Sequence, residues 1–232
     1  MNKYRHEYKY LIDSKEMAVL NIKAAGILQR DSHAGREGSY FIQSLYFDDM
    51  KNSCYRENEA GTDPRSKFRI RYYNRNTESL KLEKKSKIRG MTRKESCSIT
   101  REECELFMGG GVPEISPEFP REKQMLFGEM KVRGLMPKVI VAYDRIPFVA
   151  SAGNVRVTLD SNLVSSGEVE NFLLEKRMQR PVLPGGNSVL EVKFDEFLPS
   201  YIKEVLALDS LAWTSFSKYY LCRKYNTNGG VL

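Results

Sequence analysis

The sequence is poor in the residues that most metal centres and hydrolytic sites use. Its 232 residues include two histidines and four cysteines, and the cysteines form no C-x-x-C pair: they are Cys54, Cys97, Cys104 and Cys222. This spacing disfavours a zinc cluster and predicts reduced thiols rather than a disulfide framework. Neither His6 nor His33 lies in a G-x-S-x-G-like context, which weakens any interpretation as a serine or cysteine hydrolase.

Long hydrophobic runs are missing as well. No window approaches about 18 apolar residues, and residues 1–7 contain no hydrophobic leader, so we expect a cytoplasmic chain without a membrane segment. No linker-like stretch and no internal repeat divides the chain, which predicts a single domain over residues 1–232. The sequence gives no indication of an oligomeric state.

Charge is abundant. Lysines and arginines number 37 against 30 aspartates and glutamates, which gives a net charge of +7 at pH 7. This excess favours polyanionic partners such as phosphate chains, nucleotides, nucleic acid or anionic lipid. Many of the basic residues alternate with carboxylates instead of forming an exposed stripe with stacking aromatics, so no nucleic-acid partner is expected.

Short hydrophobic runs of period 2 dominate the chain and predict β-strands. Eight are found, at residues 7–12, 43–48, 67–73, 79–85, 92–99, 138–145, 155–159 and 188–194. Capping patterns such as Asp13 with Glu16 and Thr100 with Glu103 indicate helices between them. The predicted helices cover residues 13–25, 100–109, 120–132, 199–207 and 216–225, so the fold class is α+β.

One face of these strands is apolar, and the other carries charge of both signs. In 67–73, Phe68 and Ile70 alternate with Arg69 and Arg71. A charged face is either the solvated side of an antiparallel sheet or the lining of a barrel. Six strands share the pattern with few neutral polar residues, which favours an eight-stranded antiparallel β-barrel with its helices packed outside. Its charged lumen would need a polyanion and a cation to neutralise it.

The charged faces supply candidate phosphate and metal ligands. Arginine can bind two phosphate oxygens at once, and lysine adds a mobile point charge; the candidates are Lys9, Arg69, Arg71, Lys85, Arg145 and Arg156. A carboxylate among them suits a hard divalent cation, with Glu191 first and Glu7 and Glu83 after it. A salt bridge to Lys193 is the alternative role for Glu191.

Nine short motifs give the chain a resemblance to a known family. They lie at residues 5–10, 44–48, 68–73, 82–85, 93–95, 143–145, 155–160, 190–193 and 216–219. In this order they resemble the polyphosphate polymerase (VTC) domain, a branch of the triphosphate tunnel metalloenzyme superfamily. The wider superfamily opens with Glu-x-Glu-x-Lys, whereas this chain has Arg5 at the first acidic position, which is more similar to the polymerase branch.

The resemblance implies an eight-stranded tunnel and a role for each matching position. Phosphate ligands would be Lys9, Arg69, Arg71, Lys85, Lys94, Tyr143, Arg145, Arg156, Ser217 and Lys218. Lys193 shares the face of Glu191 and is a further candidate. Glu191, with Glu7 as a second carboxylate, would hold Mn²⁺ or Mg²⁺. Two positions keep another interpretation: Lys94 as part of a solvated hairpin, and Ser217 as an ordinary helix cap.

These residues predict phosphoryl transfer. ATP would place its phosphates in the tunnel and pass its γ-phosphoryl group to a growing inorganic polyphosphate chain, with Arg69, Arg71, Arg145, Arg156 and Glu191 as the catalytic set. Such transfer depends on positioning and charge neutralisation rather than on a protein nucleophile. Two alternatives stay open: water as the acceptor, which gives a tripolyphosphatase or nucleoside triphosphatase, and a polyphosphate-binding module without catalysis.

Overall fold

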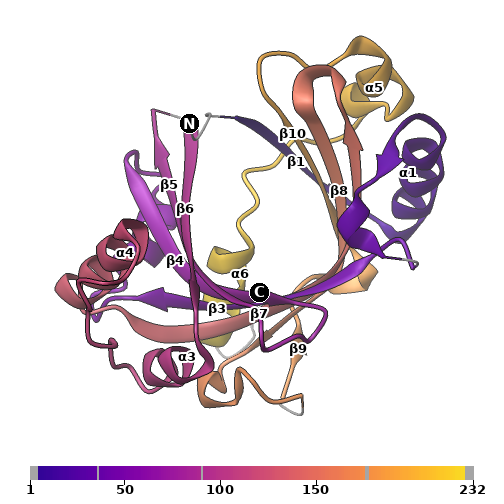
Figure 1. The fold of residues 1–232 in the computed structure, drawn as a ribbon. Coiled ribbons are helices and arrows are strands. Elements are labelled where there is room, and N and C mark those ends of the chain that lie inside the picture. Colours follow the sequence, from indigo (N-terminus) through magenta and orange to yellow (C-terminus); the bar gives the residue numbers. More distant parts are fainter. Residues whose placement is uncertain (1–4, 36, 90, 176–177, 228–232) are drawn as a thin grey trace.

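The computed structural model describes residues 5–35, 37–89, 91–175 and 178–227. Ten strands and six α-helices lie in these ranges (Figure 1). The strands are β1 (His6–Ile12), β2 (Gln29–Arg30), β3 (Tyr40–Asp48), β4 (Arg65–Tyr73), β5 (Leu80–Ile88), β6 (Met91–Ile99), β7 (Met136–Ala150), β8 (Val155–Ser166), β9 (Arg180–Pro181) and β10 (Ser188–Phe194). The helices are α1 (Ser14–Ile27), α2 (Ser53–Glu59), α3 (Arg101–Met108), α4 (Arg121–Val132), α5 (Ser200–Val205) and α6 (Lys218–Thr227). None of these helices is both long and apolar enough to cross a membrane.

All ten strands belong to one antiparallel sheet. Its main path has the order β1-β10-β8-β7-β3-β4-β5-β6, while β2 pairs with β7 and β9 pairs with β8. The eight strands of the main path are the eight that period 2 predicts, so the α+β class is confirmed. The other two strands escaped prediction because two residues are too few to show a period.

The sheet does not close into the predicted barrel. Its edge strands are β1 and β6, and in the described ranges their ladder contact is one isolated bridge between Arg5 and Thr92. The free edge of β1 pairs instead with the chain at Trp213, and the Thr214 N–H donates to the Lys9 carbonyl at 2.9 Å. Because those backbone groups are already paired, a continuous ladder from β1 to β6 cannot form there. The result is a strongly curved sheet with a seam between β1 and β6 (Figure 1).

Two apolar clusters cover the convex face of the sheet. One packs α3 and α4 against β3, β4 and β5 and includes Phe68, Ile70 and Phe127. The other packs α1 and α5 against β1, β8 and β10 and includes Val157 and Leu190. Since side chains alternate along a strand, burial of these residues directs their charged neighbours to the concave face.

Helix α6 corrects the prediction that all helices pack outside. The Tyr219 ring of α6 lies 5.1 Å from the Tyr46 ring of β3, and Tyr46 is directly opposite Arg69 in the β3–β4 ladder. Directly opposed residues share a face, so α6 packs against the same concave face as the charged residues. Figure 1 shows α6 and the chain that leads to it running inside the curve of the sheet.

The ends of the helices follow local sequence. Asp13 and Glu16 form the predicted capping box at α1, and Thr100 and Glu103 form the second one at α3. Reciprocal hydrogen bonds of this kind satisfy backbone N–H groups that the helix leaves unpaired. Helix α2 was not predicted, because it has seven residues and its N-cap Asn52 makes no side-chain hydrogen bond to the helix.

Candidate functional site

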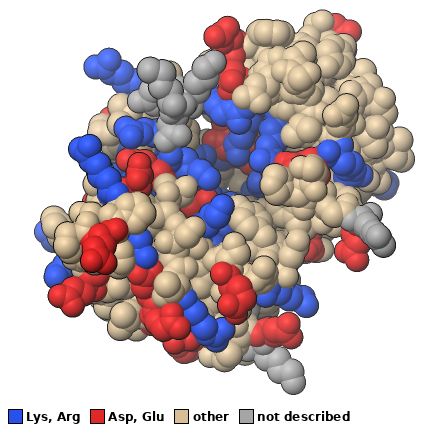
Figure 2. Space-filling model, in the orientation of Figure 1, with Lys and Arg blue, Asp and Glu red and all other residues tan. Residues whose placement is uncertain are grey.

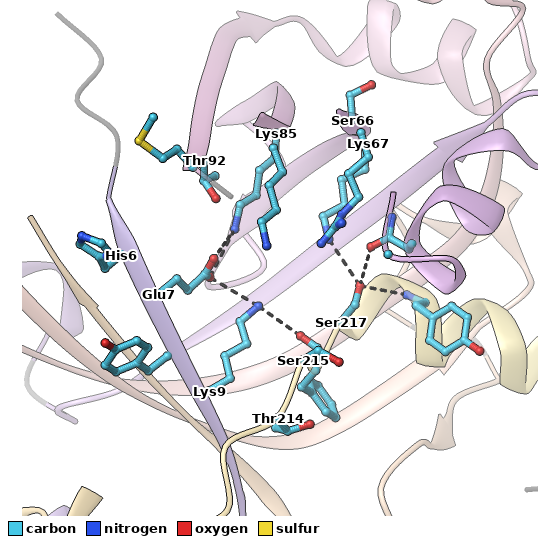
Figure 3. Close-up of a pocket in the computed structure, with 18 of the residues that line it drawn as sticks. His6, Glu7, Lys9, Ser66, Lys67, Lys85, Thr92, Thr214, Ser215 and Ser217 are labelled. Carbon is cyan, nitrogen blue, oxygen red and sulfur yellow. Dashed lines mark hydrogen bonds and ion pairs between the residues drawn. The ribbon is translucent and has the colours of Figure 1, made fainter. Parts of the chain in front are cut away.

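Two adjoining cavities lie on the concave face. The outer cavity has a volume of about 690 Å³ and lies between β1, the paired ends of β4 and β5, α2 and the chain leading into α6 (Figure 3). The inner cavity has a volume of about 80 Å³. Both are lined by Glu7, Lys9, Lys67, Lys85, Phe216 and Ser217. In the space-filling view, lysine and arginine side chains gather around the central hollow (Figure 2).

Basic side chains dominate the inner cavity. Among the described residues, eight lysines and arginines line it together with the carboxylates of Glu7 and Glu191. The basic residues are Lys9, Lys67, Arg69, Arg71, Lys85, Arg145, Lys193 and Lys218. They come from five strands and one helix, so the charge density is a product of the fold and not of one segment.

The two arginines of β4 have different partners. Arg69 Nε and Nη2 lie 2.8 and 2.7 Å from Glu83 Oε2. Arg71 Nε donates to Ser44 Oγ at 2.9 Å, and its Nη2 donates to the Tyr143 hydroxyl at 3.2 Å. Hydroxyl groups orient a guanidinium without neutralising it. Arg71 therefore keeps its positive charge for an anion in the cavity.

Glu7 of β1 and Glu191 of β10 form an acidic pair surrounded by lysines. Lys85 Nζ lies 2.9 Å from Glu7 Oε2, and Lys193 Nζ lies 3.2 Å from Glu191 Oε2. Lys9 Nζ lies 3.5 Å from Glu7 and 3.8 Å from Glu191. Burial acts to raise the pKa of Glu191, but Lys193, a hydrogen bond with the Glu7 side chain and Lys9 hold that pKa well below its ordinary value. Burial and Glu191 likewise act to raise the pKa of Glu7, and the lysines again outweigh them.

The N-terminus of α6 forms another part of the inner wall. Asp160 of β8 accepts hydrogen bonds from Arg145 Nε at 2.6 Å and Nη2 at 2.7 Å. The ammonium of Lys218 lies 2.6 Å from the same carboxylate. Ser217 caps α6, because its Oγ accepts the Tyr220 N–H at 3.3 Å. The cap interpretation is thus correct, and the residue also lines both cavities. The positive end of a helix dipole favours anions at such a position.

Two lysines of the wall are difficult to keep charged. Burial, together with Lys85 and Lys9, holds the pKa of Lys67 well below its ordinary value. Burial also lowers the pKa of Lys85 to about 8, although the Glu7 carboxylate acts in the opposite direction. Lys67 Nζ lies 3.4 Å from Ser217 Oγ (Figure 3). A bound polyanion would restore the charged form of both amines.

The structure brings most of the predicted residues together. Those that line the inner cavity are Glu7, Lys9, Arg69, Arg71, Lys85, Tyr143, Arg145, Glu191, Lys193, Ser217 and Lys218. Arg156 and Lys94 line neither cavity. Arg156 Nη2 contacts Asp31 Oδ2 and the Tyr40 hydroxyl, both at 2.9 Å. Lys94 Nζ contacts Glu83 Oε1 at 3.1 Å, and 55% of the Lys94 side chain is exposed.

Sequence reasoning missed three residues of the site. Lys67 alternates with Arg69 and Arg71 on β4, so period 2 could have found it. Asp160 lies inside one of the family motifs, but only its ion pair with Arg145 shows its role. Tyr46 also lies inside a family motif, but its place beside Arg69 depends on the β3–β4 register, which the sequence alone does not show.

The residues fit the manganese or magnesium ion that the resemblance implies. Glu7 and Glu191 lie on neighbouring strands, the lysines around them lower the pKa of both, and both line the inner cavity. Mg²⁺ commonly binds one or two carboxylates together with water and substrate phosphates. The described part of the chain contains no group of three or more His, Cys, Asp or Glu residues that could hold a metal. Phosphate oxygens would therefore have to complete the coordination.

Solved structures of low sequence identity share this fold. A putative adenylate cyclase from Bacillus halodurans is 14% identical with a TM-score of 0.56, and the alignment covers 93% of this chain and 95% of that one. A putative adenylyl cyclase from Hippeastrum, described as having a dominant triphosphatase activity, is 15% identical with a TM-score of 0.55, over 99% of this chain and 97% of that one. A Pyrococcus horikoshii protein is 13% identical with a TM-score of 0.51, over 95% and 99%.

The family assignment comes from a different comparison. No curated protein matches the chain. The family model of the VTC domain matches residues 4–226, a range that contains every strand of the sheet and every predicted site residue. The resemblance drawn from the motifs is confirmed: this chain belongs to the VTC domain family.

Proposed function

We propose that this chain is a metal-dependent polyphosphate polymerase that transfers the γ-phosphoryl group of ATP to a growing inorganic polyphosphate chain. The observation that carries the proposal is the inner cavity, in which eight basic side chains outnumber the two carboxylates of Glu7 and Glu191. Such an excess of like charge is costly in a partly buried space unless a polyanion neutralises it. ATP and polyphosphate are both polyanions of the required kind.

The buried arginines would position the transferring group. Arg71 and Arg145 are 6% and 8% exposed and are fixed by hydrogen bonds, so little side-chain entropy would be lost on binding. Lys9, Lys85 and Lys193 would contact neighbouring phosphates. We keep Arg69 in the catalytic set although Glu83 binds it, and the roles predicted for Arg156 and Lys94 stay predictions.

The reaction itself is a single displacement. A terminal oxygen of polyphosphate attacks the γ-phosphorus, the bond from that phosphorus to the β–γ bridging oxygen breaks, and ADP leaves with the bonding electrons. A divalent ion held by Glu7 and Glu191 would supply charge neutralisation between phosphate oxygens. The contribution of the chain is to bind both phosphate groups in line and to stabilise the spread of negative charge with its arginines and lysines.

A triphosphatase is the second candidate. It uses the same cavity with water as the acceptor, and one observation favours it: the Hippeastrum protein that shares this fold is described as having a dominant triphosphatase activity. The two candidates differ in their product. Transfer to polyphosphate lengthens the chain, whereas transfer to water releases orthophosphate.

The test is incubation of the purified protein with ATP and Mn²⁺ or Mg²⁺, with the products resolved by ³¹P NMR. We expect internal phosphate resonances to grow together with ADP. Glu191→Gln should reduce the rate by about 10²–10³-fold, the range found when one group that stabilises transition-state charge is removed. Glu196→Gln is the matched control, because Glu196 is exposed and lies outside both cavities.

Each result separates the candidates. Orthophosphate as the sole product would replace the polymerase by the triphosphatase. Absence of any metal-dependent product would leave a polyphosphate-binding module. If the Glu191→Gln protein is folded by circular dichroism and turns over at the normal rate, the site assignment is wrong.

A further inference from the structure

Arg156 of β8 lies beside the inner cavity without lining it. It is directly opposite Lys193 in the β8–β10 ladder, and Lys193 lines the inner cavity. Directly opposed residues share a face of the sheet, so Arg156 belongs to the concave face. Its Nη2 donates to the Tyr40 hydroxyl at 2.9 Å, and Tyr40 is opposite Arg145, which also lines the cavity. The guanidinium of Arg156 is therefore next to the basic side chains of the cavity and not among them.

The hydrogen bonding of this guanidinium is incomplete. Asp31 Oδ2 lies 2.9 Å from Nη2, the same nitrogen that contacts Tyr40. Nε is buried and has no hydrogen-bond partner among the described residues. Arg145 differs, because Asp160 accepts hydrogen bonds from both its Nε and its Nη2. A buried donor without an acceptor is unfavourable, and a phosphate oxygen in the adjoining cavity would supply the acceptor that Arg156 lacks.

Asp31 keeps its position without Arg156. Its N–H donates to the Pro147 carbonyl of β7 at 3.2 Å. Its Oδ1 accepts the His33 N–H at 2.9 Å and lies 2.7 Å from His33 Nδ1. Burial acts to raise the pKa of Asp31, but the hydrogen bonds with His33, and after them the charges of Arg156 and His33, lower that pKa below its ordinary value. The carboxylate thus keeps its contacts in the turn when the guanidinium leaves.

We propose that Asp31 is an internal competitor of the polyanion for the guanidinium of Arg156. The carboxylate holds the guanidinium outside the cavity, and a phosphate group has to displace this carboxylate before Arg156 binds it. The exchange requires only the Arg156 side chain to turn, since the backbone of β7 and His33 hold Asp31. Affinity for the polyanion is lowered by the fraction of molecules in which the guanidinium is engaged. The inference rests on the proposed function for the ligand class.

The test is a double-mutant cycle between Asp31 and Arg156, with tripolyphosphate as the probe. Asp31→Asn removes the competing charge but keeps a side-chain oxygen for the His33 N–H. Affinity is measured by calorimetry in EDTA at constant ionic strength, and we expect about tenfold tighter binding, the effect of one charge-assisted hydrogen bond gained by the ligand. In the Arg156→Gln background, Asp31→Asn should give no gain, because the guanidinium that it releases is absent.

Loss of any acid makes the chain more basic, and a second variant controls for that effect. Asp209→Asn has the same change in charge, and Asp209 is an exposed residue of the 3₁₀ turn Leu208–Ser210 that pairs with Lys203 outside both cavities. Because salt screens distant charges, it should change the affinity by less than about twofold. If Asp31→Asn does not fold, Tyr40→Phe removes the other partner of Nη2 and should also raise the affinity, by a smaller factor.

Three results would overturn the inference. Unchanged affinity in Asp31→Asn would mean that nothing competes, and an equal gain in the Arg156→Gln background or in Asp209→Asn would mean a general effect of charge. Weaker binding would mean that Asp31 orients Arg156 toward the ligand. The measurements need neither metal nor turnover. The expected cycle without chain growth in the NMR experiment would therefore reject the polymerase and keep the competition, whereas chain growth without coupling between Asp31 and Arg156 would reject only the competition.

Discussion

At the scale of the residue, Lys67 makes the charge of the inner cavity sensitive to pH. Its pKa is lowered, first by burial and then by Lys85 and Lys9. A base with a lowered pKa releases its proton at a lower pH than an ordinary lysine, whose pKa is about 10.4. Affinity for polyphosphate should therefore be greatest where Lys67 is charged and should fall as the pH rises through its lowered pKa. Calorimetric titrations from about pH 6.5 to about pH 9.5 in EDTA measure this decline.

A charge-preserving variant isolates the role of Lys67. Arginine stays protonated over this range, so Lys67→Arg should flatten the decline, and Lys67→Gln should start from a lower affinity. The titratable groups that face Lys67 are Lys9, Glu7, Arg69 and Lys85. They are present in every variant, so their own titration remains in each curve. Identical curves for the native protein and Lys67→Arg would show that another group controls the decline.

The alternation of side chains along a strand predicted which side of the sheet a residue faces, but not whether that residue lines a cavity. Arg69, Arg71 and Arg145 were found because i,i+2 spacing puts them on the charged face, and they line the inner cavity. The same alternation puts Arg156 on the charged face, but its guanidinium is bound by Asp31. Asp31 comes from a turn about 125 residues earlier in the chain, and no local pattern predicts that contact.

At the scale of the element, a buried hydrogen bond is one of the contacts that hold α6 against the sheet. The Tyr219 hydroxyl donates to Asp48 Oδ2 at 2.6 Å, and this carboxylate also accepts the Cys54 and Tyr55 N–H groups at the start of α2. Tyr219→Phe would remove a donor from a buried carboxylate. We expect it to lower the free energy of unfolding by about 1–3 kcal/mol, measured by urea denaturation.

The neighbouring tyrosine is the control for this helix. Tyr220 of α6 donates to Glu59 at 3.1 Å in an exposed position. Tyr220→Phe should therefore change the free energy of unfolding by less than about 0.5 kcal/mol. Equal effects of the two substitutions would mean that the Tyr219–Asp48 bond does not anchor α6.

Elements were predicted well wherever their signal was local. Period 2 gave all eight long strands, and capping boxes gave the starts of α1 and α3. The side on which α6 packs was wrong, because it depends on contacts with Tyr46 and Asp48 more than 150 residues away along the chain. Closure of the sheet was wrong for a similar reason, since the residues that occupy the edge of β1 lie near Trp213.

At the scale of the molecule, side chains connect the two walls on either side of the seam. Lys85 of β5 and Glu7 of β1 form an ion pair at 2.9 Å across the seam, close to the bridge between Arg5 and Thr92. A partly exposed ion pair contributes little stability by itself. A polyanion that contacts both walls would add further contacts between β1 and the β4–β5 ladder.

Polyphosphate should consequently stabilise the whole fold. A ligand that binds only the native state adds about 2.7 kcal/mol when its concentration is 100 times Kd. For chains of this length about 1 kcal/mol corresponds to about 2–4 °C in Tm, so we expect a rise of about 5–10 °C in a thermal melt in EDTA. Arg71→Gln should reduce the rise at the same concentration, because the buried guanidinium keeps its charge for the ligand. Orthophosphate at equal total phosphate is the control, and an equal rise with it would show a general salt effect instead of binding in the two cavities.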